Sequence, residues 1–198
     1  MLFLNGFHFI SGSPDHYLSA NHHCVIVTAD PVFLQCLIYV PGTNPVRLAG
    51  IEYIIGGDAF EKLDYEERQL WHSHSYEVTS GLLVEPGTPP TIDNEAMKIL
   101  VGTYGKTTHT WRYDQKNNTL PVGIPEFVGG FTNIGQLPTA AIDERDEYFS
   151  VNSTEIHKQR AEVGIHPQKI IDGADIWKKG IILTLGLVNK TGSTTFQG

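Results

Sequence analysis

The chain has 198 residues, of which 40% are hydrophobic and 18% charged, and its formal net charge at pH 7 is −8. Such a composition is typical of a globular domain and excludes a disordered chain. The acidic balance argues against nucleic acid as a partner, because surfaces that bind nucleic acid are basic. No stretch is long and apolar enough to cross a membrane, and the first residues lack the basic start of a signal peptide. We therefore expect a cytoplasmic protein without a transmembrane segment.

Three apolar, β-branched runs in the first part of the chain predict β-strands at residues 24–29, 33–40 and 50–55. The turns between them are rich in Pro, Gly and Asn, which is typical of antiparallel hairpins. Glu52 interrupts the third run. A carboxylate buried in an apolar strand is costly unless it is paired or bound to a metal, so alternation favours a Glu52 side chain that faces solvent.

The only two cysteines of the chain, Cys24 and Cys36, lie in the first two of these runs. Two cysteines do not make a disulfide framework, and without a secretory signal the sequence favours two free, buried thiols. A single bridge between them stays open as the alternative.

The rest of the chain mixes helices with strands, and Asp58 is a candidate N-cap for the first helix. We predict helices over residues 58–70, 95–101, 140–150 and 154–162, strands over 107–113 and 126–132, and a short element within 167–179. The apolar run at residues 180–188 favours a final strand of the sheet, and a surface for a lipid droplet or a protein partner is the alternative. We expect one domain over residues 1–179 and an extension over residues 180–198 that is apolar, then polar, with a frayed end.

Several short segments, spread along the chain in a fixed order, carry a family resemblance. They are FHFISGSP (7–14), HHC (22–24), QCLIY (35–39), GIEYI (50–54), LWHSH (70–74), YEV (76–78), SGLL (80–83), GTYGK (102–106) and GADIW (173–177). Over about residues 5–178 the chain thus resembles the oil body-associated proteins of plants and their fungal and bacterial relatives. The resemblance implies an association with oil bodies and their stability. It implies no chemistry, because the wider family is treated as a domain of unknown function.

The segment WHSHSYEV (71–78) holds the strongest candidate for a functional site. If it is a strand, the side chains of His72, His74 and Tyr76 share one face. Two imidazoles at this spacing can chelate one ion, as the HxH pair of cupin-type metal sites does. Glu77 points to the opposite face unless a bulge or turn brings it back, and it is then a fourth ligand, an acceptor that orients an imidazole, or a general base. Glu77 and Tyr76 are the candidate catalytic residues.

Three more histidines are candidate metal ligands. His109 lies in a predicted strand and is the natural third ligand of the HSH pair. Of the neighbours His22 and His23, only one can join the site, because adjacent strand residues face opposite ways. The predicted cofactor is a divalent transition metal, Fe, Zn, Mn, Ni or Cu, since imidazole and carboxylate suit them all. Ordinary packing of these histidines against hydrogen-bonded neighbours is the alternative.

Together these patterns predict an α+β fold: a mostly antiparallel sheet, cupin-like or partly rolled into a barrel, with peripheral helices. The leading function is a metal-dependent enzyme with a mononuclear histidine-rich site that acts on a small organic molecule. Oxygenase, lyase and isomerase chemistry and water activation all stay open. A non-catalytic, lipid-body-associated structural protein is the alternative, and a metal-binding module without turnover is a third. A lipid-droplet surface and a second copy of the chain, in a homodimer, stay open as partners.

Overall fold

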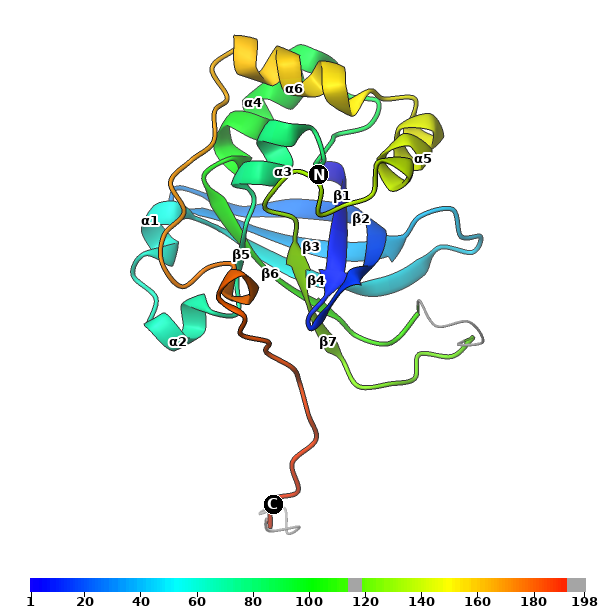
Figure 1. The fold of residues 1–198 in the computed structure, drawn as a ribbon, viewed down its shortest axis with the longest axis vertical. Helices are drawn as coiled ribbons and strands as arrows, with labels where there is room; N and C mark the ends of the chain where they lie inside the picture. Colours follow the sequence, from blue (N-terminus) through cyan, green and yellow to red (C-terminus); the bar gives the residue numbers. More distant parts are fainter. Residues whose placement is uncertain (114–118, 192–198) are drawn as a thin grey trace.

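One antiparallel sheet forms the centre of the structure, a computed structural model that describes residues 1–113 and 119–191. Its strands are β1 (Leu2–Ile10), β2 (Ser13–Ala29), β3 (Val32–Val40), β4 (Arg47–Gly56), β5 (His72–Ser73), β6 (Thr103–His109) and β7 (Glu126–Gly130). They follow the order β4-β3-β2-β1-β7-β6-β5, and β4 also pairs with β6. That extra pairing closes six strands into a barrel (Figure 1). The predicted α+β fold with a rolled sheet is confirmed.

Most of the helices gather at one end of this barrel. They are α1 (Gly57–Phe60), α2 (Tyr65–Arg68), α3 (Ser75–Ser80), α4 (Pro90–Leu100), α5 (Thr139–Phe149), α6 (Ser153–Glu162) and the 3₁₀ helix η1 (Ile176–Lys179). In Figure 1, α3, α4, α5 and α6 lie together, whereas α1 and α2 lie at the side of the barrel. The predicted helix over residues 58–70 is instead two short helices, because the backbone is extended at Asp64, the residue before α2. The other three predicted helices are confirmed.

The sequence does not predict β1, although this strand lies between β2 and β7 in the sheet. Its side chains alternate between two buried environments. Leu4 packs in the barrel interior, whereas Phe7 and Phe9 pack on the outside against Leu137 and Ile142, beneath α5. Because both faces are covered, β1 lacks the alternation of a half-exposed strand.

Two buried arginines hold the helices in place, Arg145 by bonds that reach β1 and Arg160 by bonds to other helices. Arg145 of α5 donates hydrogen bonds to the carbonyl oxygen of Leu82 (2.7 Å) and to Asn5 Oδ1 of β1 (3.2 Å). Arg160 of α6 donates to the carbonyl oxygen of Val78 in α3 (2.7 Å). Charge-assisted bonds of this kind are strong, so α3 and the residues after it are held in a fixed position against the barrel.

Cys24 and Cys36 form a disulfide bond, so the prediction of free thiols is wrong. The register of β2 and β3 places the two cysteines directly opposite each other, with their Cα atoms 4.0 Å apart. Both are buried in the barrel interior beside Leu4 and Ile54. The bridge follows from strand register, which the sequence pattern alone leaves open.

The apolar run at residues 180–188 forms no strand, so the predicted final strand is wrong. The barrel strands already pair with neighbours on both sides, and a closed barrel offers no edge for another strand. The segment instead leaves the barrel (Figure 1), and a hydrogen bond from Ser11 Oγ to the carbonyl oxygen of Leu183 (2.7 Å) holds its start. The end of the predicted extension, residues 192–198, lies outside the described residues.

Candidate metal centre

Five histidines and two glutamates lie together inside the barrel. Each of these residues is 3% or less exposed. They are His8 (β1), His22 (β2), Glu52 (β4), His72 (β5), His74 (between β5 and α3), Glu77 (α3) and His109 (β6). Burying so many titratable groups is costly unless they are paired or bind a ligand, so this histidine cluster is the strongest candidate for a functional site.

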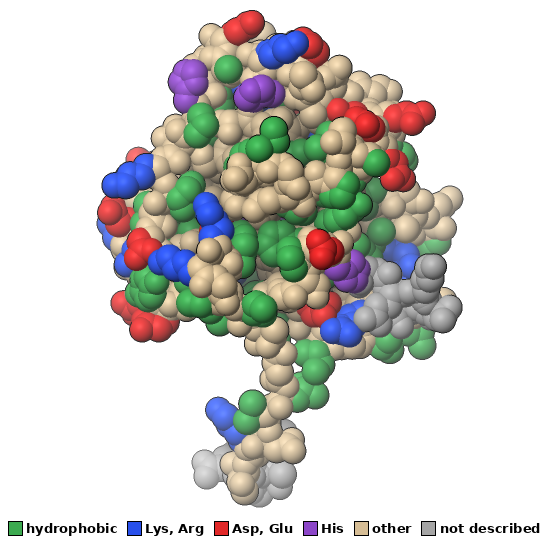
Figure 2. Space-filling view, viewed as in Figure 1, with side chains coloured by type: hydrophobic (Ala, Val, Ile, Leu, Met, Phe, Trp, Pro, Cys, Tyr) green, Lys and Arg blue, Asp and Glu red, His purple; other side chains and the backbone are tan. Residues whose placement is uncertain are grey.

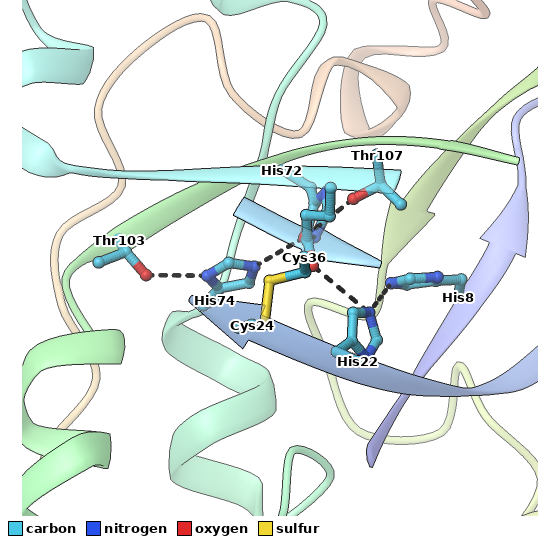
Figure 3. The surroundings of a disulfide bond; sticks show 9 residues. His8, His22, Cys24, Cys36, His72, His74, Thr103 and Thr107 are labelled. Atoms are coloured by element: carbon cyan, nitrogen blue, oxygen red, sulfur yellow. Dashed lines mark hydrogen bonds and ion pairs between the residues drawn. A yellow bond between two sulfur atoms is a disulfide. The ribbon is translucent and has the colours of Figure 1, made fainter. Parts of the chain in front are cut away.

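Glu52 lies at the centre of the histidine cluster, where its carboxylate is close to three imidazoles. Its Oε1 is 3.4 Å from His72 Nε2 and 3.3 Å from His74 Nε2, and its Oε2 is 3.3 Å from His22 Nε2. His22 Nε2 is in turn 3.3 Å from His8 Nε2, and Figure 3 shows these imidazoles converging. Two ligand atoms that each lie about 2.0–2.1 Å from a tetrahedral ion are about 3.3–3.4 Å apart. The observed separations therefore fit pairs of ligands that share an ion.

Thr103 fixes the proton position on His74. The Thr103 hydroxyl donates to the carbonyl oxygen of Leu100 (2.7 Å), so it accepts the hydrogen bond from His74 Nδ1 (2.8 Å). In the neutral imidazole the proton is then on Nδ1, and Nε2 directs its lone pair at Glu52 Oε1, 3.3 Å away. A lone pair and a carboxylate oxygen repel at this distance unless a proton or a metal ion lies between them.

Two glycines leave room for the carboxylates. A Cβ atom at Gly105 would overlap Glu52 Oε1 and lie 2.7 Å from His74 Nε2, and one at Gly130 would lie 2.8 Å from Glu77 Oε1. Both glycines are in strands, where glycine is otherwise unfavourable because it packs no side chain and loses entropy. The space that the site needs explains their positions.

The surroundings lower the pKa values of four imidazoles and of one carboxylate; the four imidazoles are those of His8, His22, His72 and His109, and the carboxylate is that of Glu52. Burial is the main cause that lowers the pKa of His72 and of His109 to about 3. Burial alone would raise the pKa of Glu52, but the hydrogen bond with His74 and the nearby imidazoles hold it well below its usual value. Neutral imidazole and ionised carboxylate are the forms that bind transition metals.

Glu77 adds a second carboxylate next to the HSH pair. Ligand atoms of His72, His74 and Glu77 all lie within 4.8 Å of one another. Burial raises the pKa of Glu77 well above its usual value, and the charges of Glu52 and Asp175 raise it further. A cation in the site would favour its ionised form, because opposite charge offsets the cost of burial.

Several ring nitrogens of the histidine cluster have no hydrogen-bond partner within the described residues. Within residues 1–113 and 119–191, the buried ring nitrogens without a hydrogen-bond partner are His8 Nδ1, His22 Nδ1, both nitrogens of His72, and His109 Nε2. Buried polar atoms in folded proteins are nearly always paired, so each exception calls for an explanation. One such explanation is a metal ion or an ordered water molecule that binds these nitrogens.

The structure brings most of the predicted site residues together. The predicted residues in the histidine cluster are His22, His72, His74, Glu77 and His109. His23 lies on the other face of β2, with its ring centroid 5.1 Å from that of Phe3 and 5.3 Å from that of Tyr39. Tyr76 packs in the apolar cluster around Phe7 and Phe131. His23 and Tyr76 therefore lie outside the histidine cluster.

Residues 71–78 do not form one strand, which is the condition under which His72, His74 and Tyr76 would share a face. β5 ends at Ser73, and α3 begins at Ser75. A bulge or turn is needed for Glu77 to reach the histidines, and the change from strand to helix at this point provides it. The same change directs Tyr76 away from the histidines. In a helix, residues one position apart point about 100° apart, so Tyr76 and Glu77 face different surroundings.

Two cluster residues are absent from the predicted ligand set, Glu52 and His8. The expectation that Glu52 faces solvent is wrong, because Glu52 shares the inner face of β4 with Ile54 while Ile51 and Tyr53 face outward. Apolar residues on both faces of β4 hide the direction of its alternation. The one available signal for Glu52 is the rarity of a carboxylate within such a run.

Comparisons with known proteins place the chain in a family. Residues 1–164 match the family described as "Protein of unknown function (DUF1264)". Oil body-associated protein 2C of Arabidopsis thaliana is 36% identical over 172 residues, which cover 86% of this chain and 71% of the relative. Oil body-associated protein 1B of the same plant is 37% identical over 169 residues, with coverages of 83% and 69%.

A relative from another plant matches a longer part of the chain. Oil body-associated protein 1A of Zea mays is 33% identical over 197 residues, which cover 97% of this chain and 79% of the relative. No solved structure matches the chain. The resemblance seen in the short sequence segments is thus confirmed over most of the chain. The chain belongs to the DUF1264 family, together with the oil body-associated proteins of Arabidopsis thaliana and Zea mays.

Proposed function

We propose that this chain binds a divalent transition-metal ion, such as Zn, Fe, Mn, Ni or Cu, inside the barrel. The observation that carries the proposal is the 3.3 Å approach of His74 Nε2 to Glu52 Oε1, with His74 Nδ1 already hydrogen-bonded to the Thr103 hydroxyl. A cation between His74 Nε2 and Glu52 Oε1 is attracted to both atoms. His72 Nε2, 3.4 Å from the same oxygen, offers the next ligand. Imidazole donors favour a transition metal over calcium or magnesium, which prefer oxygen ligands.

The burial of the site limits the chemistry that such an ion can support. A bound transition-metal ion with an open coordination position would activate water as a Lewis acid, and a redox-active ion such as Fe(II) would also bind dioxygen there. Every residue of the histidine cluster is 3% or less exposed. A cavity of about 680 Å³ lies elsewhere, lined by residues such as Tyr76, Ile142 and His157. Water and dioxygen are small enough for this closed interior, whereas an organic substrate would require the barrel to open.

Elemental analysis tests the proposal. The protein should be purified without chelator and without a metal-affinity tag, and we expect at least one transition-metal ion per chain. The double variant His72→Ala/His74→Ala should lose this ion, because it removes two ligands. His166→Ala is the matched control, since His166 is exposed and lies outside the histidine cluster. A metal-free wild-type chain, or a double variant that keeps its ion, would overturn the proposal.

Family membership favours a second function, attachment to the surface of a lipid body. The segment after residue 179 exposes apolar side chains, with Ile182 57%, Leu187 86% and Val188 77% exposed. Figure 2 shows hydrophobic side chains where this segment leaves the body of the molecule. A run of exposed apolar residues suits insertion between lipid head groups. Among the described helices, none combines the length and the apolar character needed to cross a bilayer.

Flotation with artificial oil bodies tests this second function. We expect the full chain to rise with the lipid and the variant Leu187→Asp/Val188→Asp to stay in the aqueous layer, because charges oppose insertion into lipid. Ile134→Asp is the matched control, since Ile134 is 85% exposed in a loop away from this segment. Equal flotation of all three proteins would exclude the segment as the lipid contact, and absence of flotation would exclude the function.

A further inference from the structure

Glu52 divides the histidine cluster into two halves. Its Oε1 faces His72 and His74, at 3.4 Å and 3.3 Å from their Nε2 atoms. Its Oε2 faces His22 Nε2 at 3.3 Å, and His22 Nε2 lies 3.3 Å from His8 Nε2. The two oxygens of one carboxylate thus lie next to different imidazoles. In a carboxylate that bridges two metal ions, each oxygen likewise lies beside the ligands of a different ion.

The first half contains three residues whose ligand atoms lie close together, and Glu52 lies next to two of them. His72, His74 and Glu77 place ligand atoms within 4.8 Å of one another. Together with Glu52 Oε1 they offer two nitrogen and two oxygen donors, which is the number that a four-coordinate ion takes. The hydrogen bond from His74 Nδ1 to Thr103 (2.8 Å) orients one of these ligands, as is usual for a metal-bound imidazole.

The second half consists of His8 and His22, whose Nε2 atoms are 3.3 Å apart, with the ring of His109 beside them. The ring centroid of His8 lies 4.9 Å from that of His22 and 5.6 Å from that of His109. His109 Nε2 has no hydrogen-bond partner within the described residues. Three imidazoles and Glu52 Oε2 again offer four donors. The halves adjoin, since His8, Glu52 and His72 also place ligand atoms within 4.8 Å of one another.

We propose that the barrel interior binds two divalent transition-metal ions that share the carboxylate of Glu52. The residues that hold the first ion are His72, His74 and Glu77, and those that hold the second are His8, His22 and His109. This inference rests on the proposed function and extends it from one ion to two. A single tetrahedral ion takes four ligands, and an ion held by the first half would leave His109 Nε2 buried without a hydrogen-bond partner within the described residues. Two ions about 3.5–4 Å apart are a known arrangement in hydrolytic and phosphoryl-transfer sites.

The number of ions bound by the wild-type chain decides between the proposals. The chain is stripped with a chelator, dialysed, and titrated with ZnCl₂ by calorimetry, and its zinc content is measured after gel filtration. We expect two equivalents per chain. One equivalent would overturn this inference and leave the proposed function standing, whereas none would overturn both.

Adjacent histidines of β2 provide a matched pair of variants. His22→Ala removes a ligand of the second ion and should lower the zinc content from two to one. His23→Ala changes the neighbouring residue on the opposite face of the strand and should leave two. Two ions in the His22→Ala variant, or one in the His23→Ala variant, would contradict the assignment. Circular dichroism checks that both variants fold.

Cobalt substitution tests the shared carboxylate without any variant. Two cobalt(II) ions joined through Glu52 should show magnetic exchange in electron paramagnetic resonance, with a signal that differs from the sum of two isolated ions. The first equivalent added alone gives the reference signal. Two bound ions without exchange would contradict the bridge.

Discussion

Arg145 and the histidine cluster are two groups of buried polar atoms, and they differ in how their nitrogens are paired. The nitrogens Nε, Nη1 and Nη2 of Arg145 donate hydrogen bonds to Asp146, Leu82 and Ser153, respectively. His72 is equally buried, yet both of its ring nitrogens lack a hydrogen-bond partner within the described residues. In a network that only stabilises the fold, the buried polar atoms bond to one another, whereas in a binding site some of them are paired only when the ligand is bound. Burial of polar groups therefore marks both kinds of region, and their pairing tells them apart.

The largest expected effect is on stability, in Arg145→Met. Removing the guanidinium leaves the backbone carbonyl oxygen of Leu82 without its partner and takes the opposite charge away from Asp146, which keeps only its hydrogen bonds with Ser153. We therefore expect the free energy of unfolding to fall by about 3–5 kcal/mol. Urea denaturation followed by circular dichroism measures this. His72→Gln in metal-free protein is the comparison, and it should cost less than about 1.5 kcal/mol because no hydrogen bond to His72 is lost. Equal losses in the two variants would remove the distinction between the two regions.

Gly105→Ala should abolish metal binding while the barrel stays folded. The added methyl group would occupy the space of Glu52 Oε1 and crowd His74 Nε2, so the ligands can no longer converge. Gly102→Ala is the control, because a Cβ atom at Gly102 meets nothing within 4 Å. Metal content and circular dichroism of both variants are the measurements. Full metal content in Gly105→Ala would show that the ion, if present, binds elsewhere.

Removal of the metal should lower the thermal stability of the wild-type chain. A ligand at 100 times its Kd stabilises the folded state by about 2.7 kcal/mol, which for a chain of this size corresponds to a rise in Tm of roughly 5–10 °C. Scanning calorimetry with and without metal measures the shift. The His72→Ala/His74→Ala variant should show a much smaller shift. An equal shift in both proteins would mean that the stabilising ion lies outside the histidine cluster.

Thr103→Val should have the smallest effect, a 10–100-fold loss of metal affinity. The substitution keeps the shape of the side chain but removes the oxygen that accepts from His74 Nδ1, so the imidazole loses its fixed orientation. Thr110→Val is the matched control, since its hydroxyl bonds to the carbonyl oxygen of Ala49 outside the histidine cluster. Competition with a zinc indicator measures both affinities. If the two variants bind zinc equally well, Thr103 has no part in orienting His74.

Part of the site follows from local spacing in the sequence. The separation of His72 from His74, with Glu77 three residues on, suffices to nominate these residues. Strand alternation limits His22 and His23 to one participant, and the structure selects His22. These inferences succeed because each depends on residues that are close in the chain.

The rest of the site depends on strand register, which local patterns do not determine. Glu52 reaches the histidines only because β4 turns its less apolar face inward, and apolar residues on the other face conceal this. Cys24 lies opposite Cys36 because the register of β2 and β3 pairs these two residues. A shift of one residue would place their side chains on opposite faces of the sheet. The pairing of β4 with β6 closes the barrel, so the barrel strands have no free edge for residues 180–188, which form no strand.

Anomalous diffraction from crystals of the protein, grown without chelator and recorded at the absorption edge of the metal found by elemental analysis, tests the central claim most directly. The account predicts an anomalous peak inside the barrel between Glu52 Oε1 and the imidazoles of His72 and His74, with a second peak beside His8 and His22. A barrel interior without anomalous density, in which a water molecule or a shared proton joins Glu52 to His74, would contradict the metal centre.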